Sequence, residues 1–199
     1  MNIEIQKLTP ALAEDYANFF DTTPHNNTND NDKCYCLSFC HDKVYQNGGN
    51  YWYNTSEERR SHAIQRVRDG NIQGYLAYVD GEIVGWCNAN TKADCEECMN
   101  AVRTHNGMPV DPSRVGEKVK YIACFAIAPH MQGKGVATAL LEYACQDAAE
   151  CGFDFAEAAT HMDLTQDGFR GPVALYEKCG FVRHAENDGK VVMRKALSC

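Results

Sequence analysis

The chain has 199 residues, a formal net charge of −8 at pH 7 and eleven cysteines. That length suits one domain of mixed secondary structure. The acidic charge disfavours contact with a phosphate backbone, so we expect no nucleic-acid partner. No run approaches the roughly 18 apolar residues of a membrane-spanning helix, and residues 1–8 lack the pattern of a signal peptide. We therefore expect a cytoplasmic protein with no membrane partner, built as a single domain over residues 1–199.

Hydrophobic periodicity predicts an antiparallel sheet followed by a strand–helix–strand unit. In chain order we expect a strand at 3–8, helices at 11–20 and 55–69, a hairpin over 72–79 and 82–90, a strand at 119–128, a helix at 137–151, a strand at 153–159, a helix at 173–179 and a hairpin over 181–185 and 190–197. Thr55 and Glu58 form a capping box, and Asp80-Gly81 is a favoured hairpin turn. This order predicts an α+β fold of three layers, with a mixed, mostly antiparallel central sheet between flanking helices.

Most of the cysteines are expected to be reduced thiols, because the count is odd and no signal peptide is visible. Those inside apolar runs should be small core residues, and they are Cys87, Cys124 and Cys145. Two further groups could in principle supply thiolates to zinc, namely Cys34, Cys36 and Cys40 with His41, and Cys95 with Cys98. The last pair could also be a redox pair. The groups lie about sixty residues apart and lack knuckle glycines, so we expect no metal and thiols without a function.

A glycine-bearing turn stands between the predicted strand at 119–128 and the helix at 137–151. It reads Pro-His-Met-Gln-Gly-Lys-Gly-Val-Ala over 129–137. Glycines let a backbone approach an anion, and the first amides of a helix point unpaired N–H groups at it. A nucleotide P-loop needs Ser or Thr after its lysine, and a dinucleotide fingerprint needs a third glycine where Thr138 stands. The turn is therefore either a cradle for another anion or a bare connection.

Read as Gln132, Gly135 and Ala137, this turn matches Q-x-x-G-x-A and resembles the acetyl-CoA signature of the GNAT N-acetyltransferase superfamily. The strand that ends at Pro129 stands where the fourth strand of the family does. Residues 174–181, A-L-Y-E-K-C-G-F, are similar to the L-Y-E-K-x-G-F segment of the family. The resemblance is best over 72–197 and poor over 20–70, which we expect to be a divergent segment on the acceptor side.

The resemblance implies that acetyl-CoA is the acyl-donor cosubstrate, with its pantetheine arm between a splayed fourth and fifth strand. The backbone of the fourth strand would hold the pantetheine, and the glycine turn would hold the pyrophosphate. The expected cofactor-binding residues are Phe125, Ala126, Ile127, Gln132, Gly133, Lys134, Gly135, Val136, Ala137 and Thr138. Many members carry an asparagine seven residues before the family tyrosine. This chain has Phe169 there, which puts that CoA contact in doubt.

Catalysis requires a base for the amine and an acid for the departing thiolate. Tyr176 matches the family tyrosine that lies by the sulfur, and its alternative role is packing on the sheet. Glu157 stands where several members carry a glutamate that takes the amine proton; its alternative is a structural ion pair. His161 and Asp163 are other candidates for the base.

The resemblance implies an acyltransferase that passes the acetyl group of acetyl-CoA directly to a primary amine in a ternary complex. We expect a small-molecule acceptor, bound near the aromatic-rich 20–70 segment together with Trp86 and Asn88. The alternatives are a protein or peptide N-acetyltransferase and a non-catalytic acyl-CoA-binding protein. A homodimer is compatible with each of them.

Overall fold

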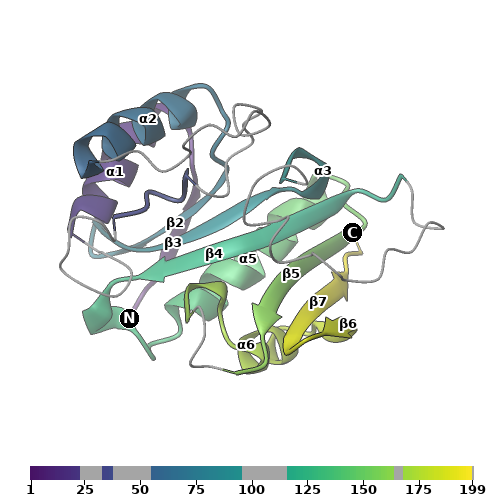
Figure 1. The fold of residues 1–199 in the computed structure, drawn as a ribbon. Coiled ribbons are helices and arrows are strands. Elements are labelled where there is room, and N and C mark those ends of the chain that lie inside the picture. The colour runs from purple at the N-terminus through teal and green to yellow at the C-terminus, as the bar shows by residue number, and fades with distance from the viewer. Residues whose placement is uncertain (23–32, 38–54, 96–115, 164–167, 199) are drawn as a thin grey trace.

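The computed structural model describes residues 1–22, 33–37, 55–95, 116–163 and 168–198. These residues build one seven-stranded sheet in the order β1-β2-β3-β4-β5-β7-β6 (Figure 1). The strands are β1 (Glu4–Lys7), β2 (Gly74–Val79), β3 (Glu82–Thr91), β4 (Val119–Ile127), β5 (Phe155–His161), β6 (Val182–Asn187) and β7 (Lys190–Ala196). The helices are α1 (Ala13–Thr22), α2 (Ser56–Arg68), α3 (Lys92–Cys95), α5 (Val136–Glu150) and α6 (Val173–Lys178), with the short 3-10 helices η1 (Pro10–Leu12), η6 (Pro129–Met131) and η7 (Gly168–Arg170).

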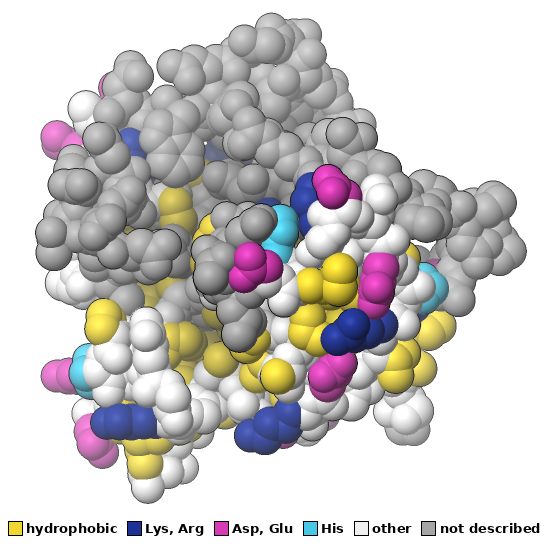
Figure 2. All heavy atoms as spheres, turned by 60° about the horizontal axis from the view of Figure 1, so that its bottom comes forward, with side chains coloured by type: hydrophobic (Ala, Val, Ile, Leu, Met, Phe, Trp, Pro, Cys, Tyr) yellow, Lys and Arg dark blue, Asp and Glu magenta, His cyan; other side chains and the backbone are white. Residues whose placement is uncertain are grey.

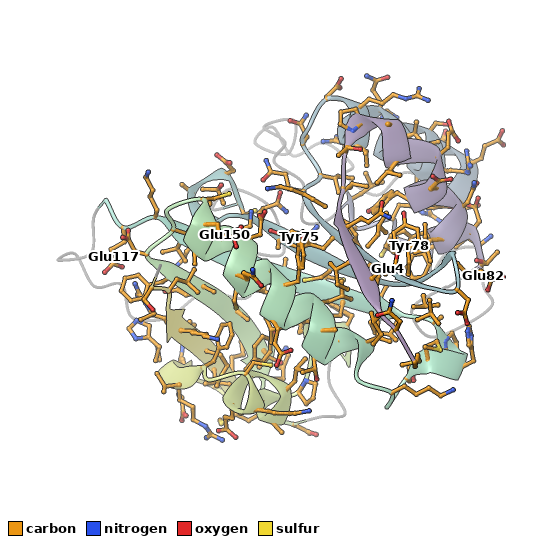
Figure 3. The ribbon with its side chains drawn as sticks, turned by 180° about the vertical axis from the view of Figure 1, so that it is seen from behind. Glu4, Tyr75, Tyr78, Glu82, Glu117 and Glu150 are labelled. Carbon is orange, nitrogen blue, oxygen red and sulfur yellow. The ribbon has the colours of Figure 1, made fainter. Side chains whose placement is uncertain are left out.

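The sheet is mixed and mostly antiparallel, as the sequence predicts. Within it β4 and β5 run parallel, and the other neighbouring strands are antiparallel. Helices α1 and α2 cover one face, and α5 and α6 cover the other; Figure 3 shows the second face from behind. Each face buries its own apolar cluster. The result is the expected three-layer α+β fold, and the two faces are called below the α1/α2 face and the α5/α6 face.

Local signals in the sequence fix the element ends that they predict. The Thr55 side chain accepts from the Glu58 amide at 3.1 Å while Glu58 returns a bond to the Thr55 amide, which completes the capping box of α2. Asp80 and Gly81 both have positive φ, as a two-residue hairpin turn between β2 and β3 requires. Within the described residues, no helix combines the length and the apolar character needed to cross a bilayer.

Strand β4 carries one extra residue at its centre. Asn88 of β3 pairs with Cys124, whereas the next residue, Ala89, pairs with Ile122, so Ala123 has no partner of its own. A β-bulge of this kind bends its strand and increases the local twist. The pairing of β4 with β5 ends at the same level, at Ile122 and Ala158. The bulge therefore marks the point at which the two parallel strands separate.

Candidate acyl-CoA site

A gap opens between β4 and β5 beyond the bulge. On one side β4 continues to pair with β3 as far as Ile127, and on the other side β5 continues to pair with β7 as far as His161. Each strand therefore turns its second edge toward the gap. Unpaired strand edges bind extended chains through backbone hydrogen bonds. Figure 2, in which the bottom of Figure 1 comes forward, shows hydrophobic side chains between polar and charged surface atoms.

The glycine turn lies at the end of β4, where it leads into α5. Gly133 and Gly135 adopt φ values of 72° and 86°, and a side chain on either would point into open space. Gly135 is the N-cap of α5 and makes no side-chain cap, so the first amides of the helix stay available. Within the described part of the chain, the amides of Gly133 and Gly135 have no backbone acceptor either. This turn fits the phosphate groups of a nucleotide-like cosubstrate, since backbone donors and a helix N-terminus face the same open side.

The residues expected to bind the cofactor lie together at this end of the gap. Those expected to hold the pantetheine form the last part of β4, and those expected to hold the pyrophosphate run from Gln132 into the first turn of α5. The Gln132 side chain donates to the backbone oxygen of Ile127 at 3.4 Å, which links the turn to the strand edge. The Phe125 ring belongs to the cluster on the α5/α6 face, together with Tyr176. The structure thus brings the expected set to one place.

The Tyr176 hydroxyl is buried beneath the gap on the α5/α6 face. It donates to the backbone oxygen of Arg170 at 2.6 Å, and its ring packs edge-on against Phe181. Burial raises the pKa of Tyr176 well above its ordinary value. A phenol in these surroundings keeps its proton, which here is held in the hydrogen bond to Arg170.

The segment after β5, in which the sequence shows Phe169 where many family members have asparagine, reaches the gap. Helix η7 lies between the ends of β4 and β5 (Figure 1). The Thr160 hydroxyl of β5 donates to the Gly171 oxygen at 2.6 Å, and a side chain on Gly171 would touch Leu175 and the Phe125 ring. Phe169, in place of the asparagine of many family members, sits in this helix. No spacing in the sequence predicts these contacts, because they depend on the main chain rather than on side-chain type.

Glu157 lies on the opposite face from Tyr176. Ala156 and Ala158 belong to the α5/α6 cluster, so the alternation of β5 turns Glu157 to the α1/α2 face. There the strand register aligns a buried polar row across four strands, made of Asn90, Tyr121, Glu157 and Arg194. This row lies just beside the level of the bulge.

Both carboxylate oxygens of Glu157 are bonded to cations. Lys92 of α3 reaches Oε2 at 2.6 Å, and Arg194 of β7 reaches Oε1 at 2.9 Å. Arg194 also pairs with Glu117, which Figure 3 labels ahead of β4, and stacks on the Phe155 ring at 3.7 Å from the centroid. The alternative expected for Glu157, an ion pair, is therefore present. A cation in the apolar closing strand is a signal that could have found Arg194, but nothing in the sequence pairs Lys92 with Glu157.

The other expected candidates for the base are less enclosed. His161 is half-buried at the end of β5, opposite Lys190, and Asp163 is exposed just beyond it. Trp86, expected near the acceptor, is fully buried and donates from Nε1 to Cys36 Sγ at 3.3 Å. It packs on Tyr16 of α1 and forms part of the core on the α1/α2 face.

The cysteines within the described residues are free thiols. Cys87, Cys124 and Cys145 are buried, as expected. No three His, Cys, Asp or Glu side chains of the described ranges are grouped so that they could hold a metal ion. Cys40, His41 and Cys98 fall outside the described residues, as do most of the aromatic residues of the 20–70 segment.

The sequence model of the Acetyltransferase (GNAT) family matches residues 41–181. The chain belongs to this family. It is an acyltransferase that takes its acetyl group from acetyl-CoA. A comparison with curated protein sequences found no match.

Solved structures share the fold of this GNAT acetyltransferase. A mosquito arylalkylamine N-acetyltransferase-like protein (5b) has a TM-score of 0.58 and 12% identity, covering 98% of this chain and 100% of that one. The PaiA N-acetyltransferase of Thermoplasma acidophilum, solved with coenzyme A, has a TM-score of 0.52 and 15% identity, covering 98% and 99%. A ribosomal-protein-alanine N-acetyltransferase of Brucella melitensis has a TM-score of 0.53 and 15% identity, also covering 98% and 99%. At these identities the likeness establishes the fold alone.

Proposed function

We propose that this GNAT acetyltransferase transfers the acetyl group directly to a primary amine of a small molecule, within a ternary complex. The observation that carries the proposal is the gap itself, with a buried carboxylate on one face of the sheet and a buried phenol on the other. An amine can approach from the α1/α2 face while the departing thiolate is met from the α5/α6 face. Two different groups can then handle the two protons without competing for one position.

Acetyl-CoA supplies a thioester, whose carbonyl carbon accepts the amine and whose C–S bond then breaks. The edges of β4 and β5 would hold its pantetheine arm, and the amides of Gly133 to Thr138 its pyrophosphate. Glu157 would take one proton from the attacking amine. Tyr176 would give one proton to the thiolate. No covalent enzyme intermediate is needed, because none of the described cysteines lies in the expected cofactor set.

Two existing contacts must change for this chemistry. The Tyr176 hydroxyl now donates to the Arg170 oxygen and must turn its hydrogen toward the sulfur. Lys92 now occupies Glu157 Oε2, and the amine, or a water that carries its proton, must replace the lysine there. The Lys92 side chain is about one-third exposed, so its ammonium group can move into solvent. Glu157 then keeps its ion pair with Arg194.

The acceptor side is proposed to be the α1/α2 face with the divergent 20–70 segment. The described part of that segment already packs there, since Tyr16 donates to the Tyr35 oxygen at 2.7 Å and Arg59 to the Lys33 oxygen at 2.8 Å. We propose that residues 1–199 act as one domain, since one sheet runs from β1 to β7. The net charge of −8 favours a cationic amine over a nucleic acid. A homodimer is compatible with this arrangement.

A peptide acceptor is the second candidate, because the fold is shared with a ribosomal-protein-alanine N-acetyltransferase as well as with an arylalkylamine N-acetyltransferase-like protein. The test is incubation with acetyl-CoA and two panels, one of small amines and one of short peptides, with CoA release and product mass as readouts. We expect acetylated small amines and no acetylated enzyme in the intact mass spectrum. An acetyl-cysteine that decays when the amine is added would overturn direct transfer, and products from peptides alone would overturn the small-molecule acceptor.

A further inference from the structure

One buried hydrogen-bond donor on the α1/α2 face has no partner. Asn88 of β3 is completely buried, and its Nδ2 makes no hydrogen bond within the described residues. The other end of the same amide is engaged, since Oδ1 accepts from Asn90 Nδ2 at 2.6 Å. That bond fixes the orientation of the carboxamide and turns Nδ2 away from Asn90.

An orphaned donor of this kind is costly. Burying an N–H group without an acceptor destabilises a fold, and such groups are rare in native proteins unless they have a use. Asn88 is flanked along β3 by the core residue Trp86 and across the sheet by Cys124, and its described hydrogen-bond partner is Asn90. A leucine would remove this orphaned donor but would leave Asn90 Nδ2 without its acceptor. The fold therefore keeps a donor that none of its described residues uses.

The position of Asn88 relates this donor to the gap. Asn88 pairs with Cys124, the residue that directly follows the bulge at Ala123, where β4 leaves β5. Its side chain lies on the same face as Asn90, which heads the row that contains Glu157. One strand spacing, about 4.8 Å, separates β3 from β4. The donor therefore lies one strand across from β4, at the level of the bulge and on the same face of the sheet as Glu157.

We propose that Asn88 is a specificity-determining residue that donates from Nδ2 to an oxygen of the acceptor, a few bonds from the reacting amine. This inference rests on the proposed function and narrows its substrate class to amines that carry a neighbouring carbonyl or hydroxyl group. Plain alkylamines leave the donor unpaired and bind more weakly. The cosubstrate thioester is the other source of a carbonyl oxygen, but its arm lies in the plane of the sheet, whereas Asn88 stands above it on the acceptor face.

The test compares matched amines that differ by one carboxamide, namely phenylalaninamide with 2-phenylethylamine and valinamide with isobutylamine. Wild-type protein should acetylate the amide of each pair with kcat/KM at least about tenfold above its partner, the value of one hydrogen bond of about 1.4 kcal/mol. Asn88→Leu should bring that ratio close to one by raising KM for the amides alone. Its unfolding midpoint should stay near that of wild type, because the variant removes one orphaned donor and leaves another at Asn90.

Asn88→Asp serves as a second variant if the leucine does not fold, since it keeps the shape and the acceptor for Asn90 but loses the donor. Tyr75→Phe is the matched control. It removes a hydroxyl that donates to Asp147 at 2.7 Å on the α5/α6 face, and the ratio should not change. Acetyl-CoA must raise the unfolding midpoint of wild type and both Asn88 variants alike. If wild type shows no such rise, the proposed function fails and the inference falls with it.

If the protein does bind acetyl-CoA, three results would overturn the inference about Asn88 while leaving the proposed function intact. The first is an unchanged ratio in a folded Asn88 variant. The second is a wild-type preference for plain amines, or no acetylation of either amide. The third is a variant that loses its preference for acetyl-CoA over CoA while its acceptor KM is unchanged, which would assign the donor to the thioester.

Discussion

At the scale of single residues, the proposed acid and base are separated by the sheet itself. Tyr176 belongs to the cluster on the α5/α6 face, and Glu157 belongs to a polar row on the α1/α2 face. Their surroundings also differ. The phenol is enclosed by apolar side chains, whereas the carboxylate is bonded to Lys92 and Arg194. Burial keeps the phenol in the protonated form that a proton donor requires.

Replacing Tyr176 with phenylalanine removes the proton donor and one buried hydrogen bond. We expect kcat to fall about a hundredfold, the lower end of the usual contribution of a general acid, with acetyl-CoA affinity unchanged. Steady-state kinetics and calorimetric titration with acetyl-CoA measure the two effects. Tyr143→Phe on α5, which removes a partly exposed hydroxyl, is the control. Equal kcat values for both variants would exclude Tyr176 as the acid.

The titration of Tyr176 gives a second prediction. Because burial raises its pKa, the folded state favours the protonated phenol. The resulting stability is fully present below the unfolded-state pKa of about 10 and is lost only as the pH rises through the higher folded-state pKa. We expect a pH profile of kcat in which Tyr176 causes no decline below about pH 10. An alkaline decline at lower pH that vanishes in Tyr176→Phe would contradict this.

Glu157 is predicted to serve both stability and catalysis. Glu157→Gln removes a charge that Arg194 and Lys92 both contact, so we expect a loss of roughly 3 kcal/mol in the free energy of unfolding and a fall in kcat of about a hundredfold. Urea unfolding and kinetics at a temperature where the variant is folded separate the effects. Glu117→Gln, which removes the other carboxylate on Arg194, should cost at most about 1 kcal/mol and leave kcat intact. If Glu157→Gln lowers the unfolding free energy but leaves kcat unchanged, Glu157 is an ion-pair partner and not the base.

At the scale of elements, the strand–turn–helix unit from β4 to α5 is where local sequence decides structure most directly. Gly133 and Gly135 hold left-handed conformations that few other residues adopt, and the helix pattern begins immediately after them. This is why the sequence could predict the glycine turn and the start of α5, while its role in binding the cosubstrate stays a prediction. The bulge at Ala123 has no such signal, because an alanine in an apolar run looks the same in a regular strand. The separation of β4 from β5 was therefore predictable only from the family resemblance.

Gly135→Ala tests the turn. Its φ of 86° strains any other residue, although the added methyl group would meet nothing. We expect a cost of about 1–2 kcal/mol in unfolding free energy and a loss of acetyl-CoA affinity of about tenfold, because the first amides of α5 shift. The matched control is Gly152→Ala after the other end of α5, where φ is 74° and the space is equally open. It should cost the same stability and leave affinity unchanged; equal affinities for both variants would show that the turn does not hold the cosubstrate.

Side-chain contacts between distant elements were the part of the site that the sequence could not predict. Lys92 and Arg194 meet Glu157 from α3 and β7, and Gly171 meets Thr160 across the loop after β5. Each contact depends on strand register or on main-chain path, neither of which leaves a local pattern. Tyr176 and Glu157 were predicted from the family resemblance, and the structure adds that they face opposite sides of the sheet.

At the scale of the whole molecule, one sheet separates Tyr176 from Glu157, the groups proposed to act on the departing thiolate and on the attacking amine. The α5/α6 face presents the turn and the phenol, and the α1/α2 face presents the polar row with Asn88. The gap between β4 and β5 connects them. We therefore propose that acceptor specificity is decided on the α1/α2 face, because the 20–70 segment, where the family resemblance is poorest, packs there. The cytoplasmic location stays a prediction from composition.

The central claim is that the gap and the glycine turn bind acetyl-CoA, and thermal unfolding with and without acetyl-CoA tests it most directly. At a hundredfold excess over the dissociation constant, a ligand of the native state adds about 2.7 kcal/mol, which corresponds to a rise of about 5–10 °C for a domain of this size. The account predicts that rise with acetyl-CoA and a much smaller one with ATP or NAD at the same concentration. No rise with acetyl-CoA, or an equal rise with all three, would contradict it.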